Sequence, residues 1–193
     1  CNALNLLDGL DGLAAGISAI SSLFFFVLFL DNNNIMGIAI SLSLLGSCVA
    51  FLVFNFNPAS IFMGDAGSMF LGMMLSVLMI HYSDTPFEYK FFLIPILICG
   101  VPIFDTALTY TRRYINKKPV FPGDRSHFYD QLIDRGFSVR KTVLISYCIG
   151  IFFGIVALIM YKVSDVKAAL IFLSVLFTLI IVVRKMNMLK MNE

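Results

Sequence analysis

One carboxylate that could do chemistry is Asp65, which lies between Gly64 and Gly67 at the junction of two long apolar segments. A charge is costly in lipid, so this side chain should face water, a cation or a polar ligand. Helix starts favour anions, and Ser68 adds a hydroxyl group there, whereas the carboxylate itself favours a cation. A complex of a phosphate with a metal ion would satisfy both preferences. The alternative is that Asp65 only caps the helix that follows.

A polar cluster with two carboxylates opens the chain, where Asn5, Asp8 and Asp11 are spaced three residues apart. On a continuous helix, this spacing predicts that the three side chains cover about a third of the circumference. Gly9 and Gly12 would let a neighbouring helix or a ligand approach closely. The cluster therefore favours a cation or polar-ligand site. Two alternatives stay open, a polar helix start in the headgroup region and an acidic ring that conducts ions.

Basic side chains are concentrated between residues 110 and 141, where eight of the fourteen Lys and Arg residues lie. Proline and glycine break helical structure in this segment. Arg125 and His127 follow as candidate donors to phosphate oxygens, and the pattern after Ser126 predicts a short amphipathic helix. The alternative is a loop that sets the membrane orientation by contacting anionic headgroups.

Asp105 lies seven residues before Arg112, which on a helix places it about 10 Å below that arginine. A buried carboxylate needs a partner. The candidates are Arg112, two turns along on the same face, and Thr109, one turn along. We therefore expect Asp105 and Arg112 to be structural residues, with direct ligand binding by Asp105 as the alternative.

Long apolar segments must position these residues. The chain has 193 residues, of which 59% are hydrophobic and 13% charged, and its mean hydropathy is +0.90. Soluble domains have about 25% charged residues, and a membrane span needs roughly 20 mostly apolar residues. The composition predicts an all-α fold, a polytopic transmembrane helical bundle forming a single domain over residues 1–193. The expected spans are residues 13–30, 35–54, 66–82, 91–109, 142–161 and 166–183.

The distribution of Lys and Arg predicts which ends face the cytoplasm. The 110–141 segment and the tail 184–193 together hold eleven of the fourteen basic residues, and two spans separate them. Both should therefore be cytoplasmic. Counting spans backwards places the segments 1–12 and 55–65 on that side as well, so all the candidate motifs converge on the cytoplasmic face.

In this order, the motifs resemble those of the polyprenyl-phosphate N-acetylhexosamine-1-phosphate transferases of glycosyl transferase family 4, which include phospho-N-acetylmuramoyl-pentapeptide transferase. The residues that carry the resemblance are Asn5-x-x-Asp8-Gly9-x-Asp11-Gly12, Phe62-Met63-Gly64-Asp65-x-Gly67-Ser68, Pro102-x-x-Asp105-Thr106 with Arg112-Arg113, and Arg125-Ser126-His127.

The resemblance implies a reaction. An N-acetylamino-sugar 1-phosphate would pass from a UDP-sugar to undecaprenyl or another polyprenyl phosphate, releasing UMP and starting the synthesis of a cell-envelope polysaccharide such as O-antigen. It implies Mg²⁺ as cofactor, with Mn²⁺ as an alternative. The expected partners are the UDP-N-acetylamino sugar, the polyprenyl phosphate and the lipid bilayer, with no nucleic acid and a homodimer left open. The expected location is the bacterial cytoplasmic (inner) membrane, with the active site on the cytoplasmic face.

The resemblance also implies residue roles. Asp65 and Asp8 would bind the metal, and Asp8, Asp11 and His127 would be catalytic. The substrate-binding residues would be Asn5, Phe62, Arg125 and Ser126, with Phe62 near the uracil and Arg125 at the diphosphate.

Two departures from the family pattern matter. Tyr129 and Asp130 stand where many relatives have further histidines, as in relatives nearer the O-antigen initiators. The family's paired aspartates precede the first motif, so the chain resembles the C-terminal part of a longer protein, and these 193 residues alone are expected to be inactive. The alternative class of function is a polytopic ion or solute transporter that uses an intramembrane Asp cluster.

Overall fold

The computed structural model describes residues 1–83, 89–117 and 127–189, and every regular element in these parts of the chain is a helix. In chain order, the helices are α1 (Asn2–Leu7), α2 (Leu13–Asp31), α3 (Ile35–Asn55), α4 (Gly64–Ser83), α5 (Lys90–Ile98), α6 (Gly100–Ile115), α7 (Phe128–Asp134), α8 (Val139–Tyr161) and α9 (Asp165–Lys185). The predicted all-α fold class is confirmed.

Within the described residues, five helices are long and apolar enough to cross a membrane, namely α2, α3, α4, α8 and α9. The predicted fourth span, residues 91–109, is not one continuous helix. In its place α5 and α6 meet at a bend of 81°, and the count of candidate spans reaches six only if this bent pair is taken as one. The chain is thus a multi-pass membrane protein.

The bend has an identifiable cause. Pro102 has no backbone N–H, so it cannot donate to the carbonyl of Ile98 as a residue inside a continuous helix would. The hydroxyl of Ser21 on α2 donates to that carbonyl instead, at 3.1 Å. The break therefore leaves no unsatisfied Ile98 oxygen, and α2 helps to hold it.

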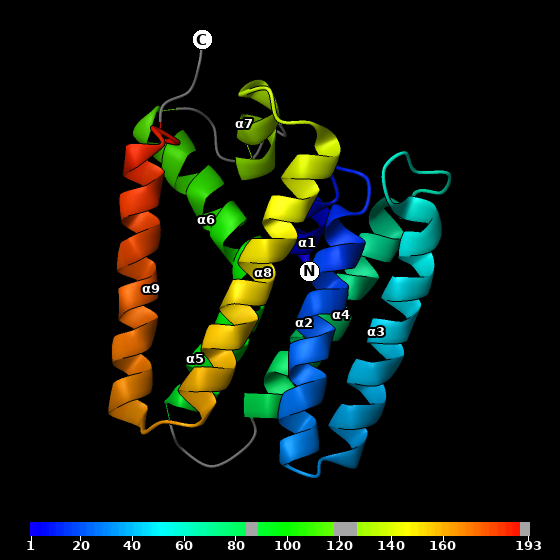
Figure 1. Cartoon of the computed structure of the whole chain (residues 1–193), viewed down its shortest axis with the longest axis vertical. Helices are drawn as coiled ribbons and strands as arrows, with labels where there is room; N and C mark the ends of the chain where they lie inside the picture. The colour runs from blue at the N-terminus through cyan, green and yellow to red at the C-terminus, as the bar shows by residue number, and fades with distance from the viewer. Residues whose placement is uncertain (84–88, 118–126, 190–193) are drawn as a thin grey trace.

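Helix α2 lies at the centre of the packing. It contacts α1, α3, α4, α5 and α8, and 72% of its most apolar window is buried, compared with 17% for α9. Figure 1 shows α2 between α3 and α8, with α9 at the outer edge of the bundle. The largest fully buried side chains along α2 are Phe25 and Phe29. This central helix begins directly after the opening acidic motif.

The opening segment is not the continuous helix predicted over Asn5, Asp8 and Asp11. Helix α1 ends at Leu7, Asp8 is its C-terminal cap, and α2 begins only at Leu13. Gly12 precedes α2 with φ +81°, a left-handed conformation that favours glycine. The three polar side chains therefore lie on a short helix and a turn instead of one helix face.

Elements from distant parts of the chain gather at one end of the bundle. Figure 1 shows α1, the 56–63 turn and α7 at the upper end, and the turn that joins α8 to α9 at the lower end. At that lower end, Asp31 pairs with Lys162 at 3.0 Å and the Asn34 side chain caps α3. The described parts of the motif-bearing segments thus share one end, as the sequence predicted. The side of the membrane that this end faces remains a prediction.

The close packing of α2 against α8 leads to a testable prediction of stability. A Cβ atom added to Gly154 would lie 2.0 Å from the ring of Phe24, whereas Gly46 on α3 has no atom within 4 Å of the same position. We expect Gly154→Ala to destabilise the protein by about 1–3 kcal/mol through overpacking, and the matched control Gly46→Ala to have little effect. Thermal unfolding in detergent, followed by circular dichroism, measures the difference. Equal melting temperatures for the two variants would contradict this packing.

Candidate functional site

The first and second motifs meet where α1 packs against the start of α4. The hydroxyl of Ser68, which is fully buried, donates to Oδ1 of Asn5 at 2.6 Å. Four residues along α4, Gly72 allows the backbone of Cys1 to approach, because a Cβ there would lie 2.6 Å from the Cα atom of Cys1. Two sequence motifs that are separated in the chain by the whole of α2 and α3 are thereby brought together.

The carboxylates of Asp8 and Asp65 lie near each other at this junction. Burial is the main cause that raises the pKa of the Asp8 carboxyl to about 6, and the charge of Asp65 is the second cause. Asp8 is half-buried and Asp65 is exposed. Neither carboxylate makes a hydrogen bond or an ion pair with another residue that the structure describes. The pair is therefore available to an external ligand, and the negative charges favour a cation.

Asp65 is the second residue of α4, which begins at Gly64. It therefore lies inside the first turn, beyond the capping position, and its side chain makes no cap hydrogen bond among the described residues. An acidic side chain in a first turn also gains from the helix dipole. The alternative that Asp65 serves only as an N-cap is not supported by this geometry.

Asp11 has surroundings that differ from those of Asp8. Its Oδ2 atom accepts hydrogen bonds from the Asn57 side chain at 2.9 Å and from the Ala59 backbone N–H at 3.1 Å. The carboxylate thus holds the 56–63 turn beside the opening motif. A catalytic role for Asp11 stays a prediction.

The 56–63 turn is fixed by further side chains that the sequence reasoning did not assign a role. Asn55, which is buried, accepts from the Gly12 backbone N–H at 3.0 Å and donates to the Ile61 carbonyl at 2.9 Å. Arg140 at the start of α8 donates to the carbonyl of Asn57. A buried amide at the end of a long apolar segment was the available sequence signal. These contacts lock the turn that carries the second motif.

Phe62 projects from this turn, with 78% of its surface exposed. Nothing among the described residues covers the ring, so a stacking partner has access to it. Its role near a uracil base stays a prediction. Arg125 and Ser126 lie outside the described residues.

His127 is held by Asp105, and this pairing was missed. Nδ1 of His127 lies 2.6 Å from Oδ2 of Asp105, and the backbone N–H of Phe128 donates to Oδ1 of Asp105 at 2.8 Å. Asp105 is fully buried. Among the described contacts, the partners of Asp105 are His127 and Phe128 and not the expected candidates Arg112 and Thr109, and the Thr109 hydroxyl lies 3.4 Å from Nδ1 of His127 instead.

Helix α7, Phe128–Asp134, confirms the short amphipathic helix predicted after Ser126, and it connects His127 to the opening motif. The ring of Tyr129 stacks on His127, with centroids 5.3 Å apart and planes within 5°. The Tyr129 hydroxyl donates to the carbonyl of Leu6 on α1 at 2.8 Å. The sequence reasoning named Tyr129 only as a departure from the family, although an aromatic residue two positions after the histidine was the signal.

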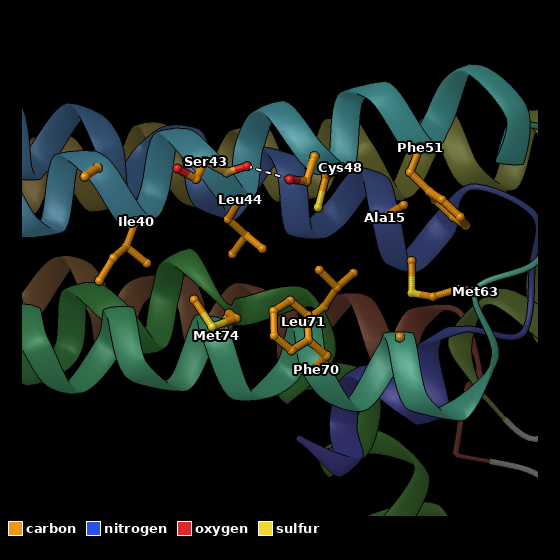
Figure 2. A pocket seen from close by; sticks show the side chains of 13 residues that line it. Ala15, Ile40, Ser43, Leu44, Cys48, Phe51, Met63, Phe70, Leu71 and Met74 are labelled. Carbon is orange, nitrogen blue, oxygen red and sulfur yellow. Dashed lines mark hydrogen bonds between the residues drawn. The ribbon is translucent and has the colours of Figure 1, made fainter.

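An apolar cavity of about 570 Å³ lies beside the site, between α2, α3 and α4. Figure 2 shows Met63 and Phe51 at one end of it and Ile40 and Met74 at the other. Its lining contains no charged residue, and the Ser47 hydroxyl in its wall is already bonded to the carbonyl of Ser43. The cavity suits hydrocarbon better than a phosphate or a nucleotide.

The residues present fit a magnesium ion held by few protein ligands. No group of three His, Cys, Asp or Glu side chains that could hold a metal occurs in residues 1–83, 89–117 and 127–189. Mg²⁺ commonly binds through one or two carboxylates and takes its other ligands from water and substrate phosphates. Asp8 and Asp65 provide such a pair, since both are oxygen donors and lack a counter-ion among the described side chains.

The proximity of the two carboxylates has a measurable consequence. With divalent cations absent, Asp65→Asn should lower the pKa of Asp8 from about 6 toward its ordinary value of 3.8, but only in part, because burial remains. A raised pKa means that the folded state binds more protons than the unfolded state between these values. The free energy of unfolding should therefore fall as pH rises through this interval, and fall less in the variant.

A ¹³C NMR titration of aspartate-labelled protein measures this pKa, with Asp8→Asn for assignment. Asp31→Asn, at the opposite end of the bundle, is the control and should leave the Asp8 titration unchanged. An equal pKa of Asp8 in wild type and Asp65→Asn would mean that the two carboxylates do not interact.

Comparison with known proteins points to the same motifs. Residues 1–83 match the model of glycosyl transferase family 4. A probable undecaprenyl-phosphate N-acetylglucosaminyl 1-phosphate transferase of Bacillus subtilis is 42% identical over 185 residues, covering 94% of this chain and 49% of that relative.

Two further groups of relatives are similar. A decaprenyl-phosphate N-acetylglucosaminephosphotransferase of Mycobacterium tuberculosis is 34% identical over 190 residues, covering 88% of this chain and 47% of its own length. A phospho-N-acetylmuramoyl-pentapeptide-transferase of Petrotoga mobilis is 37% identical over 160 residues, covering 81% of this chain and 46% of that relative. The chain spans about half the length of the curated relatives it matches. On these matches and the motifs that its helices bring together, the chain belongs to glycosyl transferase family 4.

Proposed function

We propose that the protein transfers an N-acetylamino-sugar 1-phosphate from a UDP-sugar to a polyprenyl phosphate and releases UMP. The observation that carries this proposal is the interacting pair of carboxylates, Asp8 and Asp65, which come from two different motifs and have no partner among the described residues. The names of the relatives support the same chemistry, since they are transferases named for undecaprenyl phosphate, decaprenyl phosphate or a phosphosugar pentapeptide.

The reaction is an exchange of phosphoanhydride bonds. An oxygen of the polyprenyl phosphate attacks the β-phosphorus of the UDP-sugar and forms the new P–O–P bridge. The bond from that phosphorus to the bridging oxygen breaks, and the bridging oxygen leaves on UMP. Both reactants are anions, so the main task of the site is to bring them together and to compensate their charge.

We assign Mg²⁺, or alternatively Mn²⁺, to Asp8 and Asp65. When bound, the ion would supply charge compensation for the phosphate oxygens. Asp8 must lose its proton to take part, so its raised pKa favours binding above about pH 6.

The other residues of the site would bind and orient the substrates. Asn5 uses its Oδ1 atom to accept from Ser68, which leaves its amide N–H groups for a ligand. Phe62 would stack near the uracil, and Arg125, Ser126 and His127 would contact the diphosphate. Asp11 accepts two hydrogen bonds from the 56–63 turn, and it is also a candidate catalytic residue.

We place this end of the bundle on the cytoplasmic face of the inner membrane. The basic segments 110–141 and 184–193 are expected to be cytoplasmic, and the span count puts the motif-bearing segments on the same side. The proposed partners are the UDP-N-acetylamino sugar, the polyprenyl phosphate and the bilayer. A second copy of the protein, in a homodimer, is a further candidate partner.

A transporter lined by the same carboxylates has no observation in its favour. A transport path needs polar groups through the depth of the membrane. Asp8 and Asp65 meet at one end of the bundle, Asp11 is bonded to the 56–63 turn, and Asp105 is paired with His127 at α7. Their common position favours a reaction at one membrane surface.

The proposal predicts the behaviour of Asp65→Asn in the full-length protein. Mg²⁺-dependent release of UMP should fall by at least about 100-fold, because a group that compensates charge in the transition state is lost. Asp134→Asn, which removes an exposed carboxylate from α7 at the same end, is the control and should retain its rate. Normal UMP release by a folded Asp65→Asn variant would reject the metal role. Cation flux into vesicles without UMP release would favour the transporter.

A further inference from the structure

Asp105 is a fully buried carboxylate whose two oxygens have different partners. Oδ2 lies 2.6 Å from Nδ1 of His127, and Oδ1 accepts from the backbone N–H of Phe128 at 2.8 Å. The first distance is in the range of a charge-assisted hydrogen bond. One carboxylate on α6 therefore holds both the imidazole of His127 and the backbone N–H of the next residue. It fixes the side chain and the backbone of this segment together.

The plane of the imidazole is fixed from a second direction. The ring of Tyr129 lies parallel to it, within 5°, at a centroid distance of 5.3 Å. Tyr129 is in turn tied to α1 by its hydrogen bond to the Leu6 carbonyl, and Gly9 leaves room for its hydroxyl, since a Cβ there would lie 2.3 Å from that oxygen. The imidazole can thus neither swing away from Asp105 nor tilt freely.

This arrangement specifies which nitrogen carries a proton. An ionised carboxylate only accepts hydrogen bonds, so Nδ1 must be protonated to donate to Asp105. In the neutral ring Nε2 is then an acceptor, and in the imidazolium it is a donor. The contacts of the ring with Asp105 Oδ2 at 2.6 Å and with Thr109 Oγ1 at 3.4 Å are both made by Nδ1, and His127 keeps 7% of its surface exposed. Nε2 is therefore the nitrogen left for an external group.

We propose that Asp105 is the positioning residue for His127, holding it by Nδ1 so that Nε2 is the atom presented to the phosphate groups of the substrate. The part of this inference that concerns substrate rests on the proposed function. Asp105 itself touches no substrate and acts through the ring. Carboxylates that orient a functional histidine in this way fix both its tautomer and its direction.

Nitrogen NMR tests the positioning without any substrate. The 193 residues contain two histidines, His81 and His127, and in a ¹⁵N-histidine-labelled, full-length sample the imidazole signals of His127 are the ones that disappear in His127→Gln. We expect the neutral ring of His127 to be protonated at Nδ1 in the wild type. In Asp105→Asn the Nε2-protonated form should appear, because the amide oxygen can keep the Phe128 N–H while the NH2 group that replaces the other oxygen can only donate, which requires an unprotonated Nδ1.

Asp130→Asn is the matched control. Asp130 accepts from the backbone N–H of His127 at 3.2 Å but has no bond to the ring, so its neutralisation should leave the tautomer unchanged. A wild-type His127 protonated at Nε2, or a tautomer that is the same in Asp105→Asn and wild type, would overturn the proposal. The first point is read from the wild-type signals once His127→Gln has assigned them, so it does not depend on the folding of Asp105→Asn.

Turnover tests the connection to substrate. Asp105→Asn should lower kcat for UMP release by about 10–100-fold with a smaller change in KM, and the double variant with His127→Ala should be no slower than His127→Ala alone. Additive losses would overturn the claim that Asp105 acts through His127. If the tautomer result holds and His127→Ala releases UMP normally, the proposed role of His127 in the reaction is wrong, while its positioning by Asp105 stands.

Discussion

The repulsion between two carboxylates, Asp8 and Asp65, is the interaction on which the site depends. Folding brings the half-buried Asp8 near the exposed Asp65; burial, and second the charge of Asp65, raise the pKa of Asp8, and neither group has a counter-ion among the described residues. Such an arrangement is unfavourable for an empty protein and favourable for one that binds a cation. The packing of α1 on α4, fixed by the hydrogen bond from Ser68 to Asn5, imposes this proximity. The stability of the bundle therefore holds the two charges together.

The rest of the fold holds the neighbours of this pair. The turn before α2 is clamped on both sides, because the Gly12 N–H donates to Asn55 and the Gly12 carbonyl accepts from Tyr147 on α8 at 2.5 Å. Asp11 adds a third connection, to the 56–63 turn. On the opposite flank, Tyr129 joins α7 to α1. Short polar contacts between distant segments thus surround a pair of groups that would otherwise separate, and the long apolar helices supply the frame for them.

The sequence predicted the spans well, since some 20 consecutive apolar residues are a strong and local signal. It also supplied the candidate site residues, because their motifs are contiguous. It failed where a distant partner decides the structure. The opening motif was expected to be one helix, but Gly12 turns left-handed and its N–H is taken by Asn55. Asp105 was given Arg112 and Thr109 as candidate partners from spacing along one helix, whereas its partner His127 lies on a separate segment, 22 residues away. Spacing along a helix identifies candidate neighbours only within that helix.

The most direct test of the shared cation site is a double-mutant cycle on Mn²⁺ binding, measured by electron paramagnetic resonance with the full-length protein. The compared proteins are the wild type, Asp8→Asn, Asp65→Asn and the double variant. If both carboxylates hold one ion, each single substitution should remove most of the affinity and the double variant should lose little more. Affinity that is unchanged in Asp8→Asn, or losses that simply add, would show that the two groups do not share a cation and would contradict the account.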